Sequence, residues 1–301
     1  MNRTPPYHLV VLVKQVPDTH HVTGEVMKKD GTMNRAALPA IFNPEDLNAL
    51  EMALQIKDRY GAKITVLTMG PPKAAEVLRE SLFRGADKVI LLTDRKFAGA
   101  DTLATSYALQ KAIEKIGDFD MIFAGRQAID GDTAQVGPQT AEKLGIPQIT
   151  YAEAILDLDK TAVTARRALD LGAETVKCAL PCLLTVTGSA NRPRPASARR
   201  RVQYKLAAAP MEYKTLLKQW PEFESAETLD AYLEHRNLKI PVWTTADVGA
   251  EAAQVGLAGS PTQVYKINFV VLDSKESKEF SPTKEGISAL VDELVEEYII
   301  G

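Results

Sequence analysis

The sequence predicts an α/β fold with a doubly wound, mostly parallel β-sheet, similar in type to the Rossmann fold. Short apolar segments alternate with longer amphipathic segments through the first half of the chain. This alternation is typical of β-α-β units and a parallel sheet. The apolar segments are rich in β-branched residues but lack a strict apolar-polar alternation, as strands buried on both faces require.

Composition excludes several classes of protein. The chain has 301 residues, of which 45% are hydrophobic and 25% charged, and its net charge is −3. It is long enough for a large core, and it has no overall basic charge to attract nucleic acid. No apolar run is long enough to span a bilayer, and the polar start, residues 1–7, lacks the regions of a signal peptide. We expect a cytoplasmic protein with no membrane span and no nucleic-acid partner.

The first predicted strand spans residues 8–16, and Lys14 stands at its carboxyl end, where open α/β sheets bind ligands. Lys14 either contacts a phosphate or is a solvated strand end. Residues 19–37 are polar and predict a long excursion or hairpin. A helix is predicted to start at Asn43-Pro44-Glu45-Asp46 and to end at Gly61, because this motif combines an Asn cap, an early proline and two acids. Asn43 is either a cap alone or also lies near a ligand.

The following segments continue the alternation. We predict strands at residues 63–69, 88–93 and 120–125, and helices at residues 73–83, 101–116 and 134–144. After Gly145 the pattern changes, because no helical segment separates the next predicted strands, at residues 149–156, 162–168 and 175–178. These three are expected to be antiparallel at one edge of the sheet, followed by a further buried strand at residues 180–187.

A glycine-containing loop between the strand 120–125 and the helix 134–144 is the main candidate site. A helix N-terminus after a strand has unpaired N–H groups and a positive dipole end, which favour an anion. Gly125, Gly131 and Gly137 would let the backbone approach a phosphate, ribose or ring. Asp132, three residues before Gln135, is expected to cap the helix rather than contact a phosphate. The spacing matches neither the dinucleotide fingerprint nor the P-loop, so a structural turn without a ligand is the alternative.

The remaining motifs favour structural roles. Cys178 and Cys182 do not have the spacing of redox or zinc motifs, and we interpret them as core residues in a reducing compartment, with a redox disulfide as the alternative. The sequence shows no serine-histidine-acid set and no close carboxylate pair. Chemistry alone therefore predicts only a nucleotide-binding α/β domain with a tail.

The tail differs in composition from the rest. Residues 188–201 contain two prolines and five arginines and predict an extended, exposed arm for a charged partner, or a solvated loop. Two short helices are predicted within 211–235, a turn region at 241–249, a strand at 266–272 and an amphipathic helix at 286–300. Residues 256–262 have too few large side chains to build a core. We therefore predict a nucleotide-binding domain at 1–190, and an arm and C-terminal segment at 191–301 that pack on a partner subunit.

Four motifs resemble the beta subunit of electron-transfer flavoproteins. They are residues 13–18 (VKQVPD), 43–46 (NPED), 68–71 (TMGP) and, above all, 124–138 (AGRQAIDGDTAQVGP). The similarity covers most of residues 8–190 and resumes around 243–264. Such a resemblance implies an adenine-nucleotide-binding fold in a heterodimer with an alpha subunit that holds an FAD. The beta subunit would hold a second nucleotide, either FAD or structural AMP.

The resemblance also implies which residues would contact this nucleotide. They are Leu12, Lys14, Asn43, Asp46, Met69, Gly70, Gly125, Arg126, Gln127, Asp130, Gly131, Asp132, Thr133, Ala134, Gln135, Val136, Gly137 and Pro138. Arg126 is our candidate for a cation near a flavin ring, and the alternative is that it pairs with a neighbouring acid.

Within the family, residues 130–137 resemble the bifurcating branch. Simple carriers that bind AMP more often have an acid where Gly131 stands, and a glycine leaves room for a flavin. In bifurcating members the beta-subunit FAD takes a hydride from NADH. One electron goes to a low-potential acceptor such as ferredoxin or flavodoxin, and the other goes through the alpha-subunit FAD to a dehydrogenase or quinone reductase.

The chain departs from the family pattern in the arm. Ala198 stands near the position of a leucine anchor that the family presents to acyl-CoA dehydrogenases, and arginines follow it. This departure puts the usual dehydrogenase partner in doubt. Two alternatives to the bifurcating function are a simple carrier that holds AMP and a module that senses ATP or AMP.

Overall fold

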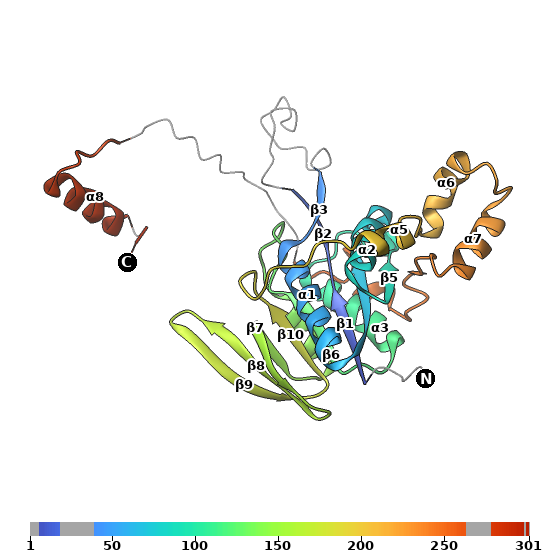
Figure 1. The fold of residues 1–301 in the computed structure, drawn as a ribbon, viewed down its shortest axis with the longest axis horizontal. Helices are drawn as coiled ribbons and strands as arrows, with labels where there is room; N and C mark the ends of the chain where they lie inside the picture. Colours follow the sequence, from blue (N-terminus) through green and yellow to red (C-terminus); the bar gives the residue numbers. More distant parts are fainter. Residues whose placement is uncertain (1–5, 19–38, 263–277, 298, 301) are drawn as a thin grey trace. The chain divides into compact units, whose positions relative to one another are not determined.

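The computed structural model describes residues 6–18, 39–262, 278–297 and 299–300. Its centre is a nine-stranded sheet with the order β11-β5-β4-β1-β6-β10-β7-β8-β9 (Figure 1). The strands are β1 (Tyr7–Leu12), β4 (Ala62–Met69), β5 (Lys88–Leu92), β6 (Met121–Gly125), β7 (Gln148–Leu158), β8 (Ala162–Leu169), β9 (Gly172–Ala179), β10 (Cys182–Val186) and β11 (Val242–Trp243). From β11 to β7 all neighbours are parallel, and β7, β8 and β9 are antiparallel. The predicted α/β sheet with an antiparallel edge is confirmed.

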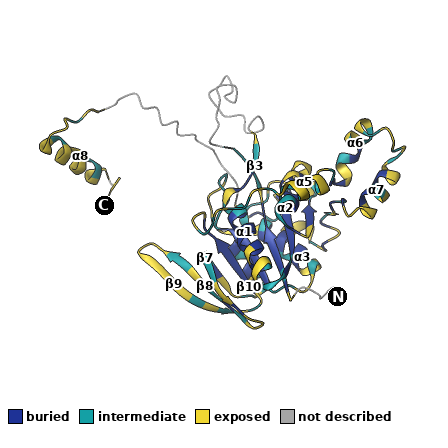
Figure 2. Ribbon diagram, in the orientation of Figure 1, coloured by how far each residue is buried: buried dark blue, intermediate teal, exposed yellow. Residues whose placement is uncertain are grey.

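Helices cover both faces of the parallel part of the sheet. Alternate residues of its central strand β1 therefore pack into two different hydrophobic clusters, one on each face. On β1, Leu9 and Val11 belong to one hydrophobic cluster, with residues of α1 (Pro44–Tyr60) and α2 (Ala75–Arg84). Val10 and Leu12 belong to the other, with residues of α3 (Thr102–Ile116) and α4 (Val136–Leu144). Figure 2 shows the buried residues gathered in the central strands and the helix faces against them. This is the doubly wound arrangement that strands buried on both faces predict.

The single strand predicted for residues 8–16 is wrong. β1 ends at Leu12, and β2 (Gln15–Pro17) pairs with β3 (Ala40–Phe42) in a separate two-stranded antiparallel sheet. The break has a local cause, because the N–H of Lys14 donates to the carboxylate of Asp46, 2.8 Å away, rather than to a strand. The excursion predicted for residues 19–37 lies outside the described residues.

β11 is an element that the sequence did not predict, because it lies in the region expected to be only a turn. It joins the edge of the parallel sheet beside β5 by two backbone hydrogen bonds. Leu91 N donates to Pro241 O at 2.9 Å, and Thr93 N donates to Trp243 O at 2.9 Å. A two-residue strand carries no periodicity that a sequence pattern could detect. Beyond it, a 3₁₀ turn (η6, Ala252–Gln254) leads to Val255, which is buried in the same cluster as α3.

The arginine-rich arm is only partly the extended, exposed segment that was predicted, because its end is helical and some of its arginines bind other parts of the chain. Residues 198–204 form a helix, α5 (Ala198–Tyr204). The Arg194 Nε donates to Glu51 Oε2, 2.8 Å away, and its Nη2 lies 2.8 Å from Asp58 Oδ2. The Arg200 Nε donates to the carbonyl of Leu82, 2.6 Å away, near the C-terminal end of α2. Two of the five arginines are therefore bound within the chain, since α1 offers acids and α2 offers free carbonyl groups.

The two helices predicted within residues 211–235 are confirmed. After a 3₁₀ turn (η5, Pro210–Glu212), α6 (Tyr213–Gln219) and α7 (Ala226–His235) form a hairpin that projects from the domain (Figure 1). Leu229 and Leu233 are fully buried. The ring of Phe223 lies 4.9 Å from that of Tyr232. The buried residues of the hairpin belong to the same hydrophobic cluster as α1 and α2.

The described residues divide into two compact units, 6–262 and 278–300. The second unit contains the predicted amphipathic helix as α8 (Lys284–Glu296). The predicted boundary at residue 190 falls inside the first unit, and packing of the tail on a partner subunit stays a prediction. The strand predicted at 266–272 lies outside the described residues. None of the described helices is long and apolar enough to cross a membrane.

The ion pair of Arg194 yields the first test. Replacing Arg194 with Ala leaves the buried Glu51 without its charged partner, so we expect the free energy of unfolding to fall by about 2–4 kcal/mol. Arg199→Ala, at an exposed position of the same arm, should change it by less than about 0.5 kcal/mol. Urea unfolding of both variants measures the difference. Equal stability of the two variants would show that Arg194 does not anchor the arm.

Candidate functional site

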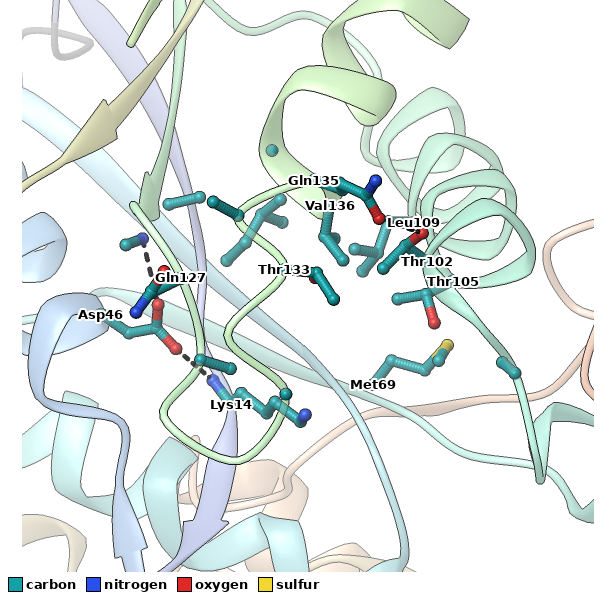
Figure 3. A pocket seen from close by; sticks show the side chains of 18 of the residues that line it. Lys14, Asp46, Met69, Thr102, Thr105, Leu109, Gln127, Thr133, Gln135 and Val136 are labelled. Atoms are coloured by element: carbon teal, nitrogen blue, oxygen red, sulfur yellow. Dashed lines mark hydrogen bonds between the residues drawn. The ribbon is translucent and has the colours of Figure 1, made fainter. Parts of the chain in front are cut away.

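A cavity of ≈ 390 Å³ opens at the carboxyl ends of β1, β4 and β6. The loop from Gly125 to Gly137 forms one side of it, and the first turns of α3 form the opposite side (Figure 3). This is the edge where parallel α/β sheets bind ligands. The volume lies within the range of small-molecule and cofactor sites, about 300–1,000 Å³. The cavity is therefore the candidate binding site.

Most of the residues predicted from the sequence meet at this cavity. Those that line it are Leu12, Lys14, Asp46, Met69, Gly125, Arg126, Gln127, Gly131, Asp132, Thr133, Ala134, Gln135, Val136 and Gly137. Asn43, Gly70, Asp130 and Pro138 do not line it. Contact of any of these residues with a nucleotide stays a prediction.

Sequence reasoning missed one wall of the cavity. It consists of residues 99–102 with Phe97, Thr105 and Leu109, and it follows a short turn, η4 (Arg95–Phe97). A signal was present in the sequence, since Asp101 begins a helix just after a parallel strand. Its carboxylate accepts from Ala104 N at 2.9 Å, which marks the N-terminus of α3 at the carboxyl edge of the sheet.

Two helix N-termini face the cavity, those of α3 and α4. They are joined by a hydrogen bond, in which Thr102 Oγ1 donates to Gln135 Oε1 at 3.0 Å. Gln135 is the N-cap residue of α4, and no side chain caps this helix. The free N–H groups and positive end of α4 are therefore available to an anion.

The expected capping role of Asp132 is wrong. Its carboxylate accepts from Gln127 Nε2, 2.9 Å away, and α4 begins at Val136 rather than at residue 134. Both Asp132 and Ala134 have left-handed backbone conformations, with φ of 50° and 52°. Such a conformation is costly for a residue with a Cβ, and it interrupts the chain before the helix can start.

The first turn of α1 holds the start of this loop. Asn43 Nδ2 donates to the carbonyl of Gln127 at 2.9 Å, and Asn43 Oδ1 accepts from Ile129 N at 3.2 Å. Glu45 Oε2 accepts from Gln127 N at 2.9 Å. Asn43 occupies the N-cap position of α1, but its side chain makes no capping hydrogen bond. The motif predicted as a helix start thus also fixes the loop.

Asp46 joins the ends of two parallel strands. Its carboxylate accepts from Lys14 N at 2.8 Å, after β1, and from Gly125 N at 3.0 Å, at the end of β6. Burial raises the pKa of Asp46 to about 7, against the lowering effect of hydrogen bonds from Asn43, Lys14 and Gly125. The carboxyl group is therefore part of the cavity wall and titrates near neutral pH.

The two cationic side chains of the lining are already paired. Lys14 Nζ lies 2.7 Å from Asp130 Oδ1, and Arg126 Nη2 lies 3.1 Å from Glu45 Oε1. The Arg126 guanidinium also lies 5.8 Å from the ring centre of Tyr151. Of the two roles considered for Arg126 from the sequence, the structure shows the second, in which it pairs with a neighbouring acid, Glu45. Among the described lining residues, the N–H groups at the uncapped start of α4 and threonine hydroxyl groups are donors left for an anion.

The three glycines of the loop stand at their positions for different reasons. A Cβ on Gly125 would lie 2.4 Å from Asp46 Oδ1, and one on Gly137 would lie 2.7 Å from Thr185 Cγ2. Packing within the chain therefore requires these two glycines. A Cβ on Gly131 would meet no atom within 4 Å, so only Gly131 leaves open space at the cavity.

Comparisons with known proteins agree on one family. A model described as the electron transfer flavoprotein domain matches residues 30–211. The chain is 41% identical to an electron transfer flavoprotein subunit beta of Clostridium acetobutylicum, over 97% of this chain and 100% of that protein. It is 43% identical to the caffeyl-CoA reductase-Etf complex subunit CarD of Acetobacterium woodii, over 86% of each chain. It is 39% identical to the protein FixA of Sinorhizobium fredii, over 96% of this chain and 92% of that protein.

Alanine should destabilise the chain at Gly125 and leave its stability unchanged at Gly131. Gly125→Ala forces a methyl group onto Asp46 and the backbone of α1, so we expect the free energy of unfolding to fall by about 2–4 kcal/mol. Gly131→Ala should leave it within about 0.5 kcal/mol of the wild type. Urea unfolding measures both, and a destabilised Gly131→Ala variant would contradict the assignment of open space there.

Titration of Asp46 predicts a pH dependence of stability. Its folded-state pKa of about 7 lies above its ordinary value of 3.8, so the folded state holds a proton that the unfolded state releases. Its stabilising contribution is complete below about pH 4 and is lost as the pH rises through 7. Relative to Asp46→Asn, the wild type should lose about 1.4 kcal/mol of unfolding free energy per pH unit between about pH 5 and 6.5. Urea unfolding across this range measures it, and parallel profiles would refute it.

Proposed function

This chain belongs to the electron transfer flavoprotein family, and from that premise we propose that it is a beta subunit that binds FAD in the cavity described above. We propose further that it accepts electrons at this FAD, as a hydride from NADH. It passes them through the FAD of an alpha subunit to a dehydrogenase or quinone reductase, and to a low-potential acceptor such as ferredoxin or flavodoxin. The activity is electron bifurcation in the cytoplasm.

The observation that carries the proposal is the pair of helix N-termini that face one cavity. The N-terminus of α4 has no side-chain cap, and the first turn of α3 contributes Thr102 and Thr105 to the lining. Backbone N–H groups and hydroxyl groups in such a position suit the diphosphate of a dinucleotide. Leu67, Met69 and Leu109 supply an apolar wall that suits an aromatic ring.

The open space at Gly131 supports FAD rather than AMP. Since a Cβ there would meet no atom within 4 Å, the loop leaves room that an adenylate alone does not need. When bound, FAD supplies two-electron and one-electron transfer chemistry. The chain would contribute binding and orientation: the helix N-termini hold the phosphates, and the apolar wall excludes water from one side of the ring.

A simple carrier with structural AMP is the second candidate. The observation that favours it is the pairing of both lining cations, Lys14 with Asp130 and Arg126 with Glu45. Neither side chain is free to stabilise negative charge on a reduced flavin. The two candidates share the same cavity and differ in its occupant.

The partners follow from the family. Relatives named as beta subunits and as a subunit of a caffeyl-CoA reductase-Etf complex support a heterodimer that delivers electrons to a reductase or dehydrogenase. Ala198, the first residue of α5, stands near the position of the family's anchor leucine, and the exposed Arg199 and Arg201 follow it. An acyl-CoA dehydrogenase of the usual kind is therefore not the partner that we propose.

The test is a cofactor count. The chain is purified with its alpha subunit, the complex is denatured, and released FAD and AMP are measured. We expect two FAD and no AMP per heterodimer, with the second FAD held by this chain. One FAD and one AMP would refute bifurcation and leave the simple carrier. A complex without any nucleotide would contradict both candidates.

Two variants of one residue provide the control. Gly131→Asp fills the open space at the cavity with an acid, so the complex should lose the FAD of this chain and retain that of the alpha subunit. Gly131→Ala adds only a methyl group into space that meets no atom within 4 Å and should retain both. Equal FAD content in the two variants would show that the space at Gly131 does not decide the occupant.

A further inference from the structure

Asp46 is a buried acid with no cationic partner of its own. Its residue is 7% exposed, yet it belongs to the wall of the cavity. Both of its oxygens accept backbone N–H groups, from Lys14 at 2.8 Å and Gly125 at 3.0 Å. These hydrogen bonds stabilise the carboxylate, but burial has the larger effect and disfavours the charged form, because it removes water that would stabilise the charge.

The charged groups around it do not offset this cost. The end of β1 contributes Lys14, which is paired with Asp130 of the loop. The loop also contributes Arg126, which is paired with Glu45 of α1 itself. The remaining acids of the lining are Asp132 on the loop and Asp101 at the start of α3. Cations are thus outnumbered by carboxyl groups on the described side chains around the cavity.

Asp46 and Asp101, two acids of the lining without a cationic partner, differ in how readily they accept a proton. Asp101 is stabilised as a carboxylate, because hydrogen bonds from Ala104 and Thr262 outweigh the effect of burial and hold its pKa below its usual value. Burial raises the pKa of Asp46 to about 7. Near neutral pH, Asp46 is therefore divided between its charged and neutral forms.

We infer that Asp46 takes up a proton from the solvent when an anionic nucleotide enters the cavity, so that binding is linked to pH. The inference rests on the proposed nucleotide site. Negative charge brought into the cavity raises the free energy of the Asp46 carboxylate by Coulomb repulsion, which favours its neutral form. One proton moves from the solvent to one carboxylate oxygen, and no other bond changes. Proton uptake keeps the charge of the wall low when phosphates are present.

Calorimetry of nucleotide binding tests this directly. The probes are FAD and ADP-ribose, because their phosphates are diesters and do not titrate near pH 7, unlike the monoester of AMP. Each is titrated into the complex of the full chain and its alpha subunit, in which the alpha subunit retains its FAD and the site of this chain has been emptied, at pH 7, in PIPES and in imidazole. The difference in binding enthalpy between the buffers gives the number of protons taken up. From a pKa of about 7, we expect an uptake approaching about half a proton.

The variants Asp46→Asn and Asp87→Asn show whether Asp46 is the group that takes up the proton. The Asp87 carboxylate also accepts a backbone N–H at a strand end, from Ile64 at 2.9 Å, but it does not line the cavity. We expect Asp46→Asn to abolish the uptake and Asp87→Asn to retain it. The same uptake in Asp46→Asn as in the wild type would overturn the inference, as would no uptake in the wild type.

The wild type alone gives a second measurement, in case Asp46→Asn does not fold or bind. Its Kd for ADP-ribose should be constant below about pH 6 and should rise by up to about tenfold per pH unit above pH 7. A Kd that does not change between about pH 6 and 8.5 would overturn the inference. Failure of both probes to bind would contradict the proposed function instead, whereas binding without proton uptake contradicts only the role of Asp46.

Discussion

The first turn of α1 joins the ends of two strands and the start of one loop, and the arrangement of the site depends on it. Asn43, Glu45 and Asp46 direct their side chains away from their own helix and hold backbone groups of residues 14 and 125–129. These backbone groups would otherwise be unpaired at the carboxyl edge of the sheet. So close a contact leaves no room for a Cβ at Gly125, where the nearest atom would be 2.4 Å away. The positions of the end of β6 and the beginning of α1 relative to each other are therefore fixed by this contact.

The rest of the loop adapts to that fixed start. Between Gln127 and α4 the chain turns through two left-handed residues, Asp132 and Ala134, and reaches the helix without a capping side chain. Strained backbone is found at ligand sites more often than elsewhere, and an uncapped N-terminus keeps its N–H groups free. Since Lys14 and Arg126 are paired with acids, the uncapped N-terminus of α4 is a further source of positive potential in the cavity. The contacts that organise the fold thus also shape the cavity in which we propose that an anion binds.

Sequence patterns predicted the fold well because alternating apolar strands and amphipathic helices are signals that extend over many residues. They predicted the glycine loop and Asp46 at the site because both belong to a motif that resembles a known family. They failed where the cause is not local. Arg194 and its partner Glu51 are separated by 143 residues, so the arginine-rich run resembled a free arm. Asp132 has the spacing of a cap, but Gln127 holds its carboxylate. The wall formed by the start of α3 was missed although Asp101 marks a helix start after a parallel strand, because a capping acid alone does not separate a ligand-facing helix end from an ordinary one.

We propose that the cavity between the loop and the start of α3 binds the nucleotide of this family member. A crystal structure of the chain with its alpha subunit and its natural cofactor tests it most directly. The account predicts density for a nucleotide between Thr102 and Val136, with phosphate oxygens within hydrogen-bonding distance of N–H groups of α4. A nucleotide bound elsewhere on this chain, with the cavity filled only by solvent, would contradict it.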